Sequence, residues 1–204
     1  MKKKKLEILL QKVPSQEKPV PNLEQYMTPA NIAADIIFIA HQFGDIENKK
    51  VIDLGCGTGI FSVGAILTGA EKVIGIDIDK NSIMIAHRYA QENNLNIKYL
   101  ILDVEKVNIS CDTVIMNPPF GAQKSNLKAD RKFIEKGFEI AKVIYSIHLS
   151  KTIPFIKKMI SSLGGIIDYS KDYIFPIPKI FDFHEKEKKN YEVTFIRIKT
   201  NYKK

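Results

Sequence analysis

Short apolar segments alternate with stretches of helical periodicity along most of this chain, and this alternation restricts the fold more than any other feature. The apolar segments predict strands over residues 51–54, 72–77, 97–102, 113–116 and 143–148. Helical patterns fill the intervals over residues 60–67, 80–92, 129–142 and 154–163. Strands that alternate with helices form βαβ units and a parallel sheet. Two last strands, at about 165–176 and 190–199, predict an antiparallel hairpin at one edge. We therefore expect an α/β fold with a central, mostly parallel, seven-stranded sheet and helices on both faces.

The region before residue 50 has a different pattern. The first 20 residues combine a short basic amphipathic stretch with a segment rich in proline, which predicts an arm rather than a core element. Thr28 is the expected N-cap of the next helix, with Pro29 in its first turn and Gly44 at its end. We expect an arm and covering segment over residues 1–27, followed by a single domain over residues 28–204.

The composition excludes several classes of protein. With 45% hydrophobic residues the chain can bury a core, which excludes disorder for most of it. No run of 18 uncharged apolar residues occurs, and the first lysines are followed by Glu7 rather than by a long apolar stretch. Neither a membrane-spanning helix nor a secretory signal is therefore expected. Two cysteines, Cys56 and Cys111, form no disulfide framework and cannot complete a zinc site alone. We expect a cytoplasmic protein that holds no metal.

The charge is distributed unevenly along the chain. Residues 1–119 contain 13 Lys and Arg against 14 Asp and Glu, whereas residues 120–204 contain 18 against 9. A basic half of this kind indicates a polyanionic partner. The alternative is a lysine-coated surface that only keeps the protein soluble.

The first motif with chemical meaning is a glycine loop between a strand and a helix. Residues 53–59 read DLGCGTG, and Asp77 ends the next strand 18 residues after Gly59. Glycines let a ligand approach the main chain, and a carboxylate at the end of the second strand can accept hydrogen bonds from ribose hydroxyls. NAD and S-adenosylmethionine both fit this pattern, although the G-x-G-x-G spacing favours the latter. Asp103 ends the third strand, where a polar group meets an adenine edge in nucleotide-binding sheets.

The second motif follows the fourth strand and reads Asn117, Pro118, Pro119, Phe120. Two prolines make this loop rigid. The lone pair of an exocyclic amine such as adenine N6 is delocalised into the ring, so the nitrogen must be oriented before it can attack. The Asn117 side-chain oxygen and the Pro118 carbonyl can accept hydrogen bonds from that amine, and Phe120 can stack on the base.

Taken together, these motifs resemble the class I S-adenosylmethionine-dependent methyltransferases with a Rossmann-like fold, and among them the branch that carries Asn-Pro-Pro-Phe. Further segments, at residues 23–26, 46–49, 145–148 and 183–184, resemble the methyltransferase-like proteins that modify one adenosine of small-subunit ribosomal RNA. The resemblance covers residues 23–198 and implies methylation of adenine N6 in that RNA. It further implies a catalytic motif at Asn117, Pro118, Pro119 and Phe120. The cofactor contacts that it implies are Gln25, Thr28, Gly55, Thr58, Ile60, Asp77, Asp103, Val104 and Asn117.

Two partners are expected from the same considerations. We expect RNA phosphates to contact basic residues just after the catalytic motif, namely Lys124, Lys128, Arg131 and Lys132. In the usual strand order of this fold the third strand, residues 97–102, lies at an open edge of the sheet, which invites strand addition. Relatives in this family bind a small zinc-containing activator subunit there, so the resemblance implies such a subunit at this edge.

Two other functions remain open at the level of sequence. Protein glutamine-N5 methyltransferases have a similar Asn-Pro-Pro-aromatic loop, but they usually carry an N-terminal helical domain for which this chain has too few residues. A noncatalytic RNA-binding or ribosome-assembly factor could retain the fold, although the intact Asp77 and Asn117 argue against it.

Overall fold

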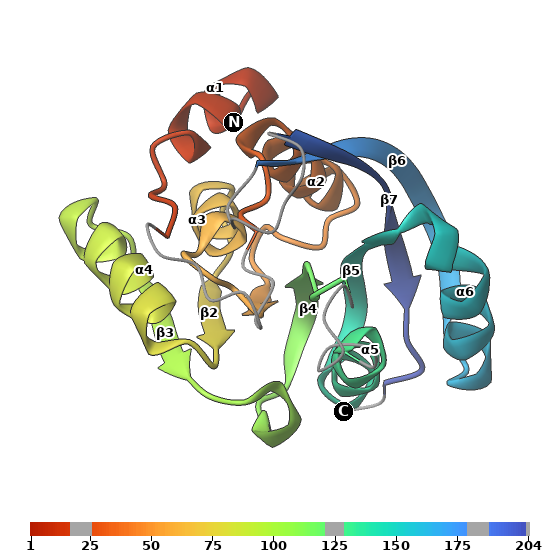
Figure 1. Ribbon diagram of the computed structural model, residues 1–204. Helices are drawn as coiled ribbons and strands as arrows, with labels where there is room; N and C mark the ends of the chain where they lie inside the picture. The colour runs from red at the N-terminus through yellow and green to blue at the C-terminus, as the bar shows by residue number, and fades with distance from the viewer. Residues whose placement is uncertain (17–25, 121–128, 179–187, 203–204) are drawn as a thin grey trace.

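The computed structural model describes residues 1–16, 26–120, 129–178 and 188–202, and its centre is a seven-stranded sheet (Figure 1). The strands are β1 (Lys50–Leu54), β2 (Lys72–Asp77), β3 (Ile97–Ile101), β4 (Cys111–Met116), β5 (Ala141–Leu149), β6 (Ile166–Pro178) and β7 (Lys188–Lys199). Their order is β3-β2-β1-β4-β5-β7-β6. Neighbours among the first five strands pair in parallel, whereas β7 pairs antiparallel with both β5 and β6. The expected fold class and the C-terminal hairpin are confirmed.

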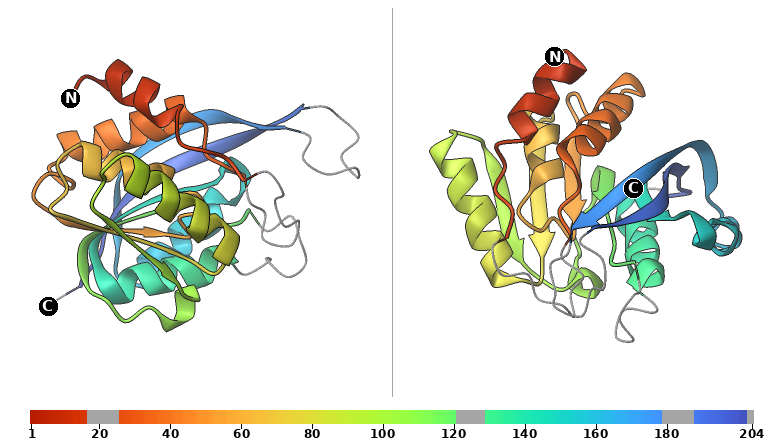
Figure 2. Two further views of the ribbon diagram at one scale, coloured as in Figure 1. Left: turned by 90° about the vertical axis from the view of Figure 1, so that its left-hand side faces the viewer. Right: turned by 45° about the horizontal axis from the view of Figure 1, so that its top comes forward.

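Helices flank both faces of this sheet (Figure 2). They are α1 (Lys3–Leu10), α2 (Ala30–Gln42), α3 (Ile60–Leu67), α4 (Lys80–Glu92), α5 (Ala129–Ile140) and α6 (Ile153–Ser162). On one face, α1, α2 and α3 pack a hydrophobic core that includes Ile36 of α2 and Phe61 of α3. On the other face, Ile134 of α5 and Ile156 of α6 join a second core. Within the described ranges, no helix has the length and apolar character needed to cross a membrane.

The beginning of the chain differs from expectation. Residues 1–20 were expected to form an arm outside the core, which is wrong for α1 and the turn after it. Leu6, Leu10 and Val13 are buried and belong to the same core cluster as α2. The lysine-rich sequence conceals this, because leucines four residues apart form only a narrow apolar stripe on a basic helix.

A buried carboxylate fastens α1 to the rest of the domain. Asp35 of α2 accepts a hydrogen bond from Lys3 at 2.8 Å and further bonds from Lys171 and Tyr173 of β6. These partners hold the pKa of Asp35 at about 2, against the effect of burial, because ammonium and hydroxyl donors favour the ionised form. One side chain thereby joins α1, α2 and β6.

The boundary between α5 and β5 also differs from the sequence expectation. A helix was expected through residue 142, whereas α5 ends at Ile140 and β5 begins at Ala141, which pairs with Cys111 of β4. Apolar residues continue across this junction, so the hydrophobic pattern alone does not mark the change. Ladder formation with β4 decides where the strand begins.

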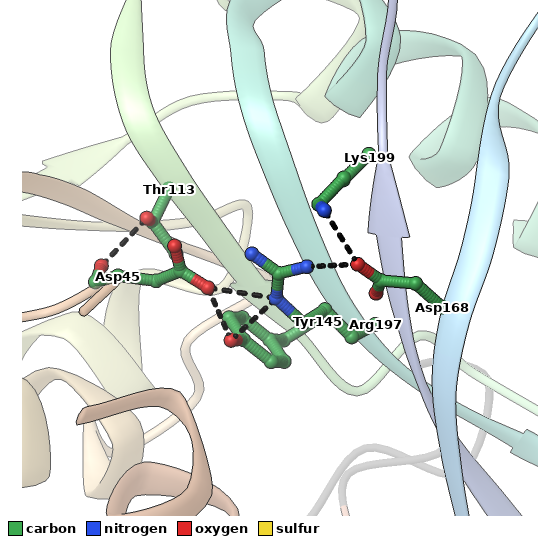
Figure 3. Close-up of polar contacts among 6 residues, drawn as sticks. All are labelled: Asp45, Thr113, Tyr145, Asp168, Arg197 and Lys199. Atoms are coloured by element: carbon green, nitrogen blue, oxygen red, sulfur yellow. Dashed lines mark hydrogen bonds and ion pairs between the residues drawn. The ribbon is translucent and has the colours of Figure 1, made fainter. Parts of the chain in front are cut away.

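A polar network ties the hairpin to the centre of the sheet (Figure 3). Arg197 of β7 donates from Nε to Asp45 at 2.8 Å and from a terminal nitrogen to Asp168 of β6. Tyr145 donates to the same Asp45 carboxylate. Two further contacts complete the network, Thr113 Oγ1 with the Asp45 carbonyl at 2.6 Å and Lys199 with Asp168 at 3.0 Å. The loop before β1 is therefore joined to β5 and β7 through the buried Asp45 and Arg197, and Arg197 extends the network to Asp168 of β6 at the surface.

Candidate active site

One cavity opens where β1, β2 and β4 end, at the edge at which parallel sheets bind ligands. Its volume is about 290 Å³. Many of the residues singled out from the sequence line it, namely Thr28, Gly55, Thr58, Ile60, Asp77, Asp103, Val104, Asn117 and Pro119. The fold therefore brings together the glycine loop, the acidic strand end and the Asn-Pro-Pro-Phe loop, which lie far apart in the chain.

The glycine loop takes a conformation that only glycine adopts readily. Gly55 and Gly59 have φ angles of 74° and 89°. The backbone N–H groups of Gly55 and Cys56 donate to the carbonyl of Ile76 at 2.8 and 2.9 Å, which ties the loop to β2. A Cβ atom at Gly59 would overlap the hydroxyl of Tyr99, a side chain of β3. The loop thus packs against the outermost strand of the sheet.

Asp53 anchors the other side of this loop. Its carboxylate is buried and accepts hydrogen bonds from the backbone N–H and the hydroxyl of Ser62, at 2.8 and 2.6 Å. Burial raises the pKa of Asp53 to about 7, although both bonds favour the ionised form. Asp53 therefore joins the end of β1 to the first turn of α3 and fixes the loop between them.

Asp77 ends β2 with its carboxylate at the cavity. Oδ2 accepts from the backbone N–H of Gly57 at 2.8 Å, and Oδ1 accepts from that of Asp79 at 2.9 Å. Burial raises the pKa of Asp77, and the two N–H donors oppose that shift. Each oxygen keeps a second lone pair, so the carboxylate is oriented and can still accept from a ligand.

Asp103 and Val104 form the part of the wall that follows β3. The Asp103 carboxylate caps the short η2 helix (Val104–Lys106) by accepting from the backbone N–H of Glu105 at 2.9 Å. Val104 packs against the second core cluster. Asp103 therefore both caps a turn and forms part of the cavity wall.

Asn117 and Thr28 meet across 89 residues of sequence. The side-chain nitrogen of Asn117 donates to Thr28 Oγ1 at 3.1 Å. The expectation that Thr28 caps α2 is wrong, because the helix begins at Ala30, Pro29 occupies the cap position, and no side chain caps it. The Asn117 side-chain oxygen is buried and has no hydrogen-bond partner among the described residues.

Phe120 closes the motif and rests on a residue that the sequence did not reveal. Its ring packs edge to face on Phe175 of β6, with centroids 5.8 Å apart. Phe175 is fully buried, whereas Phe120 is half-buried. The C-terminal hairpin therefore supports the Asn-Pro-Pro-Phe loop through one aromatic contact.

Two of the four basic residues expected to contact RNA lie in the described part of α5. Lys132 lines the cavity and pairs with Glu105 at 2.7 Å, and Arg131 pairs with Glu135 at 2.8 Å. Lys124 and Lys128, as well as Gln25 of the expected cofactor contacts, lie outside the described residues.

Comparison with known proteins decides the family. Residues 34–142 match the model of the methyltransferase small domain. The protein named rRNA N(6)-adenosine-methyltransferase METTL5 of Danio rerio is 37% identical over 97% of this chain and 99% of its own length.

This chain belongs to the methyltransferase small-domain family.

Solved structures agree with this membership. A candidate RNA methyltransferase of Pyrococcus horikoshii, PH1948, has 39% identity and a TM-score of 0.91, with 98% of each chain covered. The same fold is found in magnesium protoporphyrin IX methyltransferase from Synechocystis, which was solved with bound S-adenosylmethionine. That structure has 18% identity and a TM-score of 0.66, and the match covers 83% of this chain and 78% of its own.

The methyltransferase uses S-adenosylmethionine as its cofactor, as expected from the sequence. The cavity fits such a group, because the half-buried carboxylate of Asp77 stands beside a glycine loop whose backbone is accessible from the cavity. Gln16, which the sequence did not single out, completes the wall next to α4. It donates to Asp79 at 3.2 Å and accepts from Ser82 at 2.8 Å. A single glutamine in a proline-rich segment carries no signal that could have revealed this contact.

Proposed function

We propose that this methyltransferase transfers a methyl group to N6 of one adenosine in small-subunit ribosomal RNA. One observation carries the proposal. The Asn117 side-chain oxygen is buried without a hydrogen-bond partner among the described residues, on a proline-stiffened loop that borders the cofactor cavity. A buried acceptor left unpaired is costly, and sites of chemistry are where such groups are retained. The names of the full-length relatives support ribosomal RNA and adenine N6 as the target.

The residues of the chain position the amine in this proposal. Asn117 Oδ1 and the Pro118 carbonyl accept hydrogen bonds from the amino group, which turns the nitrogen lone pair out of conjugation and toward the methyl donor. As positive charge develops on the nitrogen, both bonds strengthen, so the transition state is stabilised more than the ground state. S-adenosylmethionine, when bound, supplies a methyl group that is already electrophilic. Holding the two reactants in line therefore provides most of the rate.

The remaining walls of the cavity hold the two substrates in the same proposal. Asp77 accepts hydrogen bonds from the ribose of the cofactor, and Asp103 with Val104 borders its adenine. Thr58, Ile60 and the loop main chain surround the rest of it, and the family resemblance adds Gln25 as a further contact. Phe120 stacks on the target base, and its contact with Phe175 keeps the ring in place.

The basic residues near the start of α5 are proposed to hold the RNA backbone. Lys132 and Arg131 are exposed, so solvent and salt screen their pairs with Glu105 and Glu135 and these pairs are weak. A phosphate can replace either glutamate. Lys124 and Lys128 extend this basic group along the chain, and together these contacts offset the unstacking of the target adenosine.

A protein partner is proposed at β3. Among the described residues no strand pairs with its outer side, so this edge offers free backbone groups. Leu102 N–H donates to Asp77 on the β2 side, and the N–H of the preceding residue, Ile101, therefore points to the open side. Ile101 is also 53% exposed. A small zinc-containing activator that adds one strand would cover both features.

Transfer of labelled methyl groups tests the proposed reaction. Total RNA, DNA and protein from a strain that lacks the gene would be incubated with the enzyme and tritiated S-adenosylmethionine, and labelled nucleosides would be identified by mass spectrometry. We expect N6-methyladenosine from small-subunit RNA. Label in glutamine of a protein would replace this proposal by protein methylation, and cofactor binding without any transfer would indicate an assembly factor.

Asn117→Ala tests the assigned mechanism. We expect a loss of at least about 100-fold in kcat, since the variant removes an acceptor that acts mainly in the transition state, while cofactor affinity stays within about tenfold. Rapid methylation by a folded Asn117→Ala variant would refute it.

A further inference from the structure

The side-chain amide of Asn117 has a donor end and an acceptor end, and the direction in which it is turned decides what it can bind. Its nitrogen faces Thr28 Oγ1 at 3.1 Å, and its oxygen has no partner among the described residues. The opposite rotamer would present two N–H donors where the oxygen now lies. A target amino group, which is itself a donor, would then meet another donor and could not be held.

We infer that Thr28 is a positioning residue whose hydroxyl oxygen sets the direction of the Asn117 amide. This inference rests on the proposed function, because it assigns the orientation that an amine substrate requires. Thr28 accepts from the nitrogen, and the side-chain oxygen of Asn117 is thereby left for the substrate.

The backbone around Thr28 makes it a rigid support. Proline at position 29 restricts the preceding residue to extended conformations, and the branched Cβ of threonine limits its side-chain rotamers. Thr28 is only 4% exposed. Pro29 occupies the cap position of α2 and no side chain caps that helix, so the hydroxyl of Thr28 is not used there. Its oxygen is free to accept from Asn117.

This role is separable from a contact with the cofactor, which the family resemblance implies for Thr28. A residue that only binds cofactor changes the affinity for S-adenosylmethionine and leaves kcat at saturation unchanged. A residue that orients Asn117 changes kcat and leaves that affinity nearly unchanged. The hydroxyl hydrogen of Thr28 remains available to a ligand in the cavity, so the two roles are chemically compatible and must be separated by experiment.

Thr28→Val and Thr28→Ser form the decisive pair. Valine has nearly the same shape but no acceptor, and we expect kcat to fall at least about tenfold with the Kd for S-adenosylmethionine within about threefold. Serine restores the acceptor, and we expect its kcat to return to within about threefold of the wild type. Thr113→Val is the matched control, because it removes a buried hydroxyl bond of 2.6 Å to the Asp45 carbonyl, outside the cavity. It should lower Tm and leave kcat unchanged.

A second measurement is independent of methyl transfer. The side-chain N–H signals of Asn117, assigned by their loss in Asn117→Asp, report the bond to Thr28 in an NMR spectrum of the free enzyme. We expect one of these protons to exchange slowly in the wild type and in Thr28→Ser, and rapidly in Thr28→Val. If the wild type methylated no adenosine, the proposed function would fail, and this spectrum would still decide whether Thr28 orients the amide. Wild-type kcat in Thr28→Val, or an unchanged Asn117 signal, would overturn the inference.

Discussion

Removing the charge of Asp35 should loosen the attachment of α1 and make the protein less sensitive to acid. In Asp35→Asn the side chain keeps its shape but loses its ion pairs with Lys3 and Lys171. The pKa of Asp35 is about 2, against an ordinary value of 3.8. At about 1.4 kcal/mol for each pKa unit, the folded state gains about 2.5 kcal/mol from this ionisation. Both lysines are about half exposed, so salt screens the pairs and we expect a net loss of about 2 kcal/mol.

The pH dependence follows from the direction of the shift. A carboxyl with a lowered pKa contributes its full stability above the unfolded value of 3.8, and this contribution is lost as the pH falls through about 2. Urea unfolding of the wild type between pH 5 and pH 2 should therefore show a steeper loss of free energy than that of Asp35→Asn. At pH 7 the variant should unfold about 4–8 °C lower, as expected for about 2 kcal/mol in a domain of this size.

Asp172→Asn is the matched control for this experiment. Asp172 is an exposed carboxylate of β6, next to the Lys171 that pairs with Asp35, and it accepts from the hydroxyl of Thr194 rather than from a lysine. Its variant should follow the wild-type curve. Parallel curves for the wild type and Asp35→Asn across the acid range would show that the buried carboxylate does not stabilise α1 through its charge.

Three further outcomes are expected. Asp77→Ala should weaken S-adenosylmethionine binding at least about tenfold in calorimetry, since each charge-assisted bond is worth about 1.5–3 kcal/mol; unchanged affinity would give Asp77 a purely structural role. Reversal of charge at the four proposed RNA-binding residues of the 124–132 segment should flatten the plot of log K for RNA binding against log salt. The slope should change by about 0.7–0.9 for each phosphate that is no longer neutralised. The control, Lys157→Glu with Lys158→Glu on α6, should leave the slope unchanged. Ile101→Pro should weaken binding of a strand-adding partner in pull-down and light-scattering assays. Ile101→Ser keeps the backbone N–H and should weaken this binding less. A stable, fully active monomer of the isolated chain would argue against the partner.

The sheet and the cavity were predictable because their signals are local. A glycine loop between a strand and a helix and a proline-stiffened motif after a strand can be recognised within about ten residues, and Asp77 is placed by the end of its strand. The edge position of β3 also follows from the usual strand order, and the sheet has it.

The contacts that sequence reasoning missed join distant segments. Thr28 meets a residue 89 positions away, and local preference favoured a helix cap for it. Phe175 supports Phe120 from another element, and Gln16 reaches α4 from the N-terminal segment. The α1 helix looked like a solvated basic arm because only a narrow stripe of leucine contacts the core. In each case tertiary packing, which has no local signature, determined the outcome.

The side-chain oxygen of Asn117 has a consequence for how this protein can be engineered. A buried acceptor that finds no partner, as this oxygen finds none among the described residues, costs about 1–3 kcal/mol of folding free energy, and in a fold with a narrow margin of stability that is a substantial fraction. A search for thermostable variants that ignored activity would thus favour apolar residues at position 117 and would discard the chemistry. Selection under turnover would keep asparagine there and would find its stabilising substitutions elsewhere in the molecule.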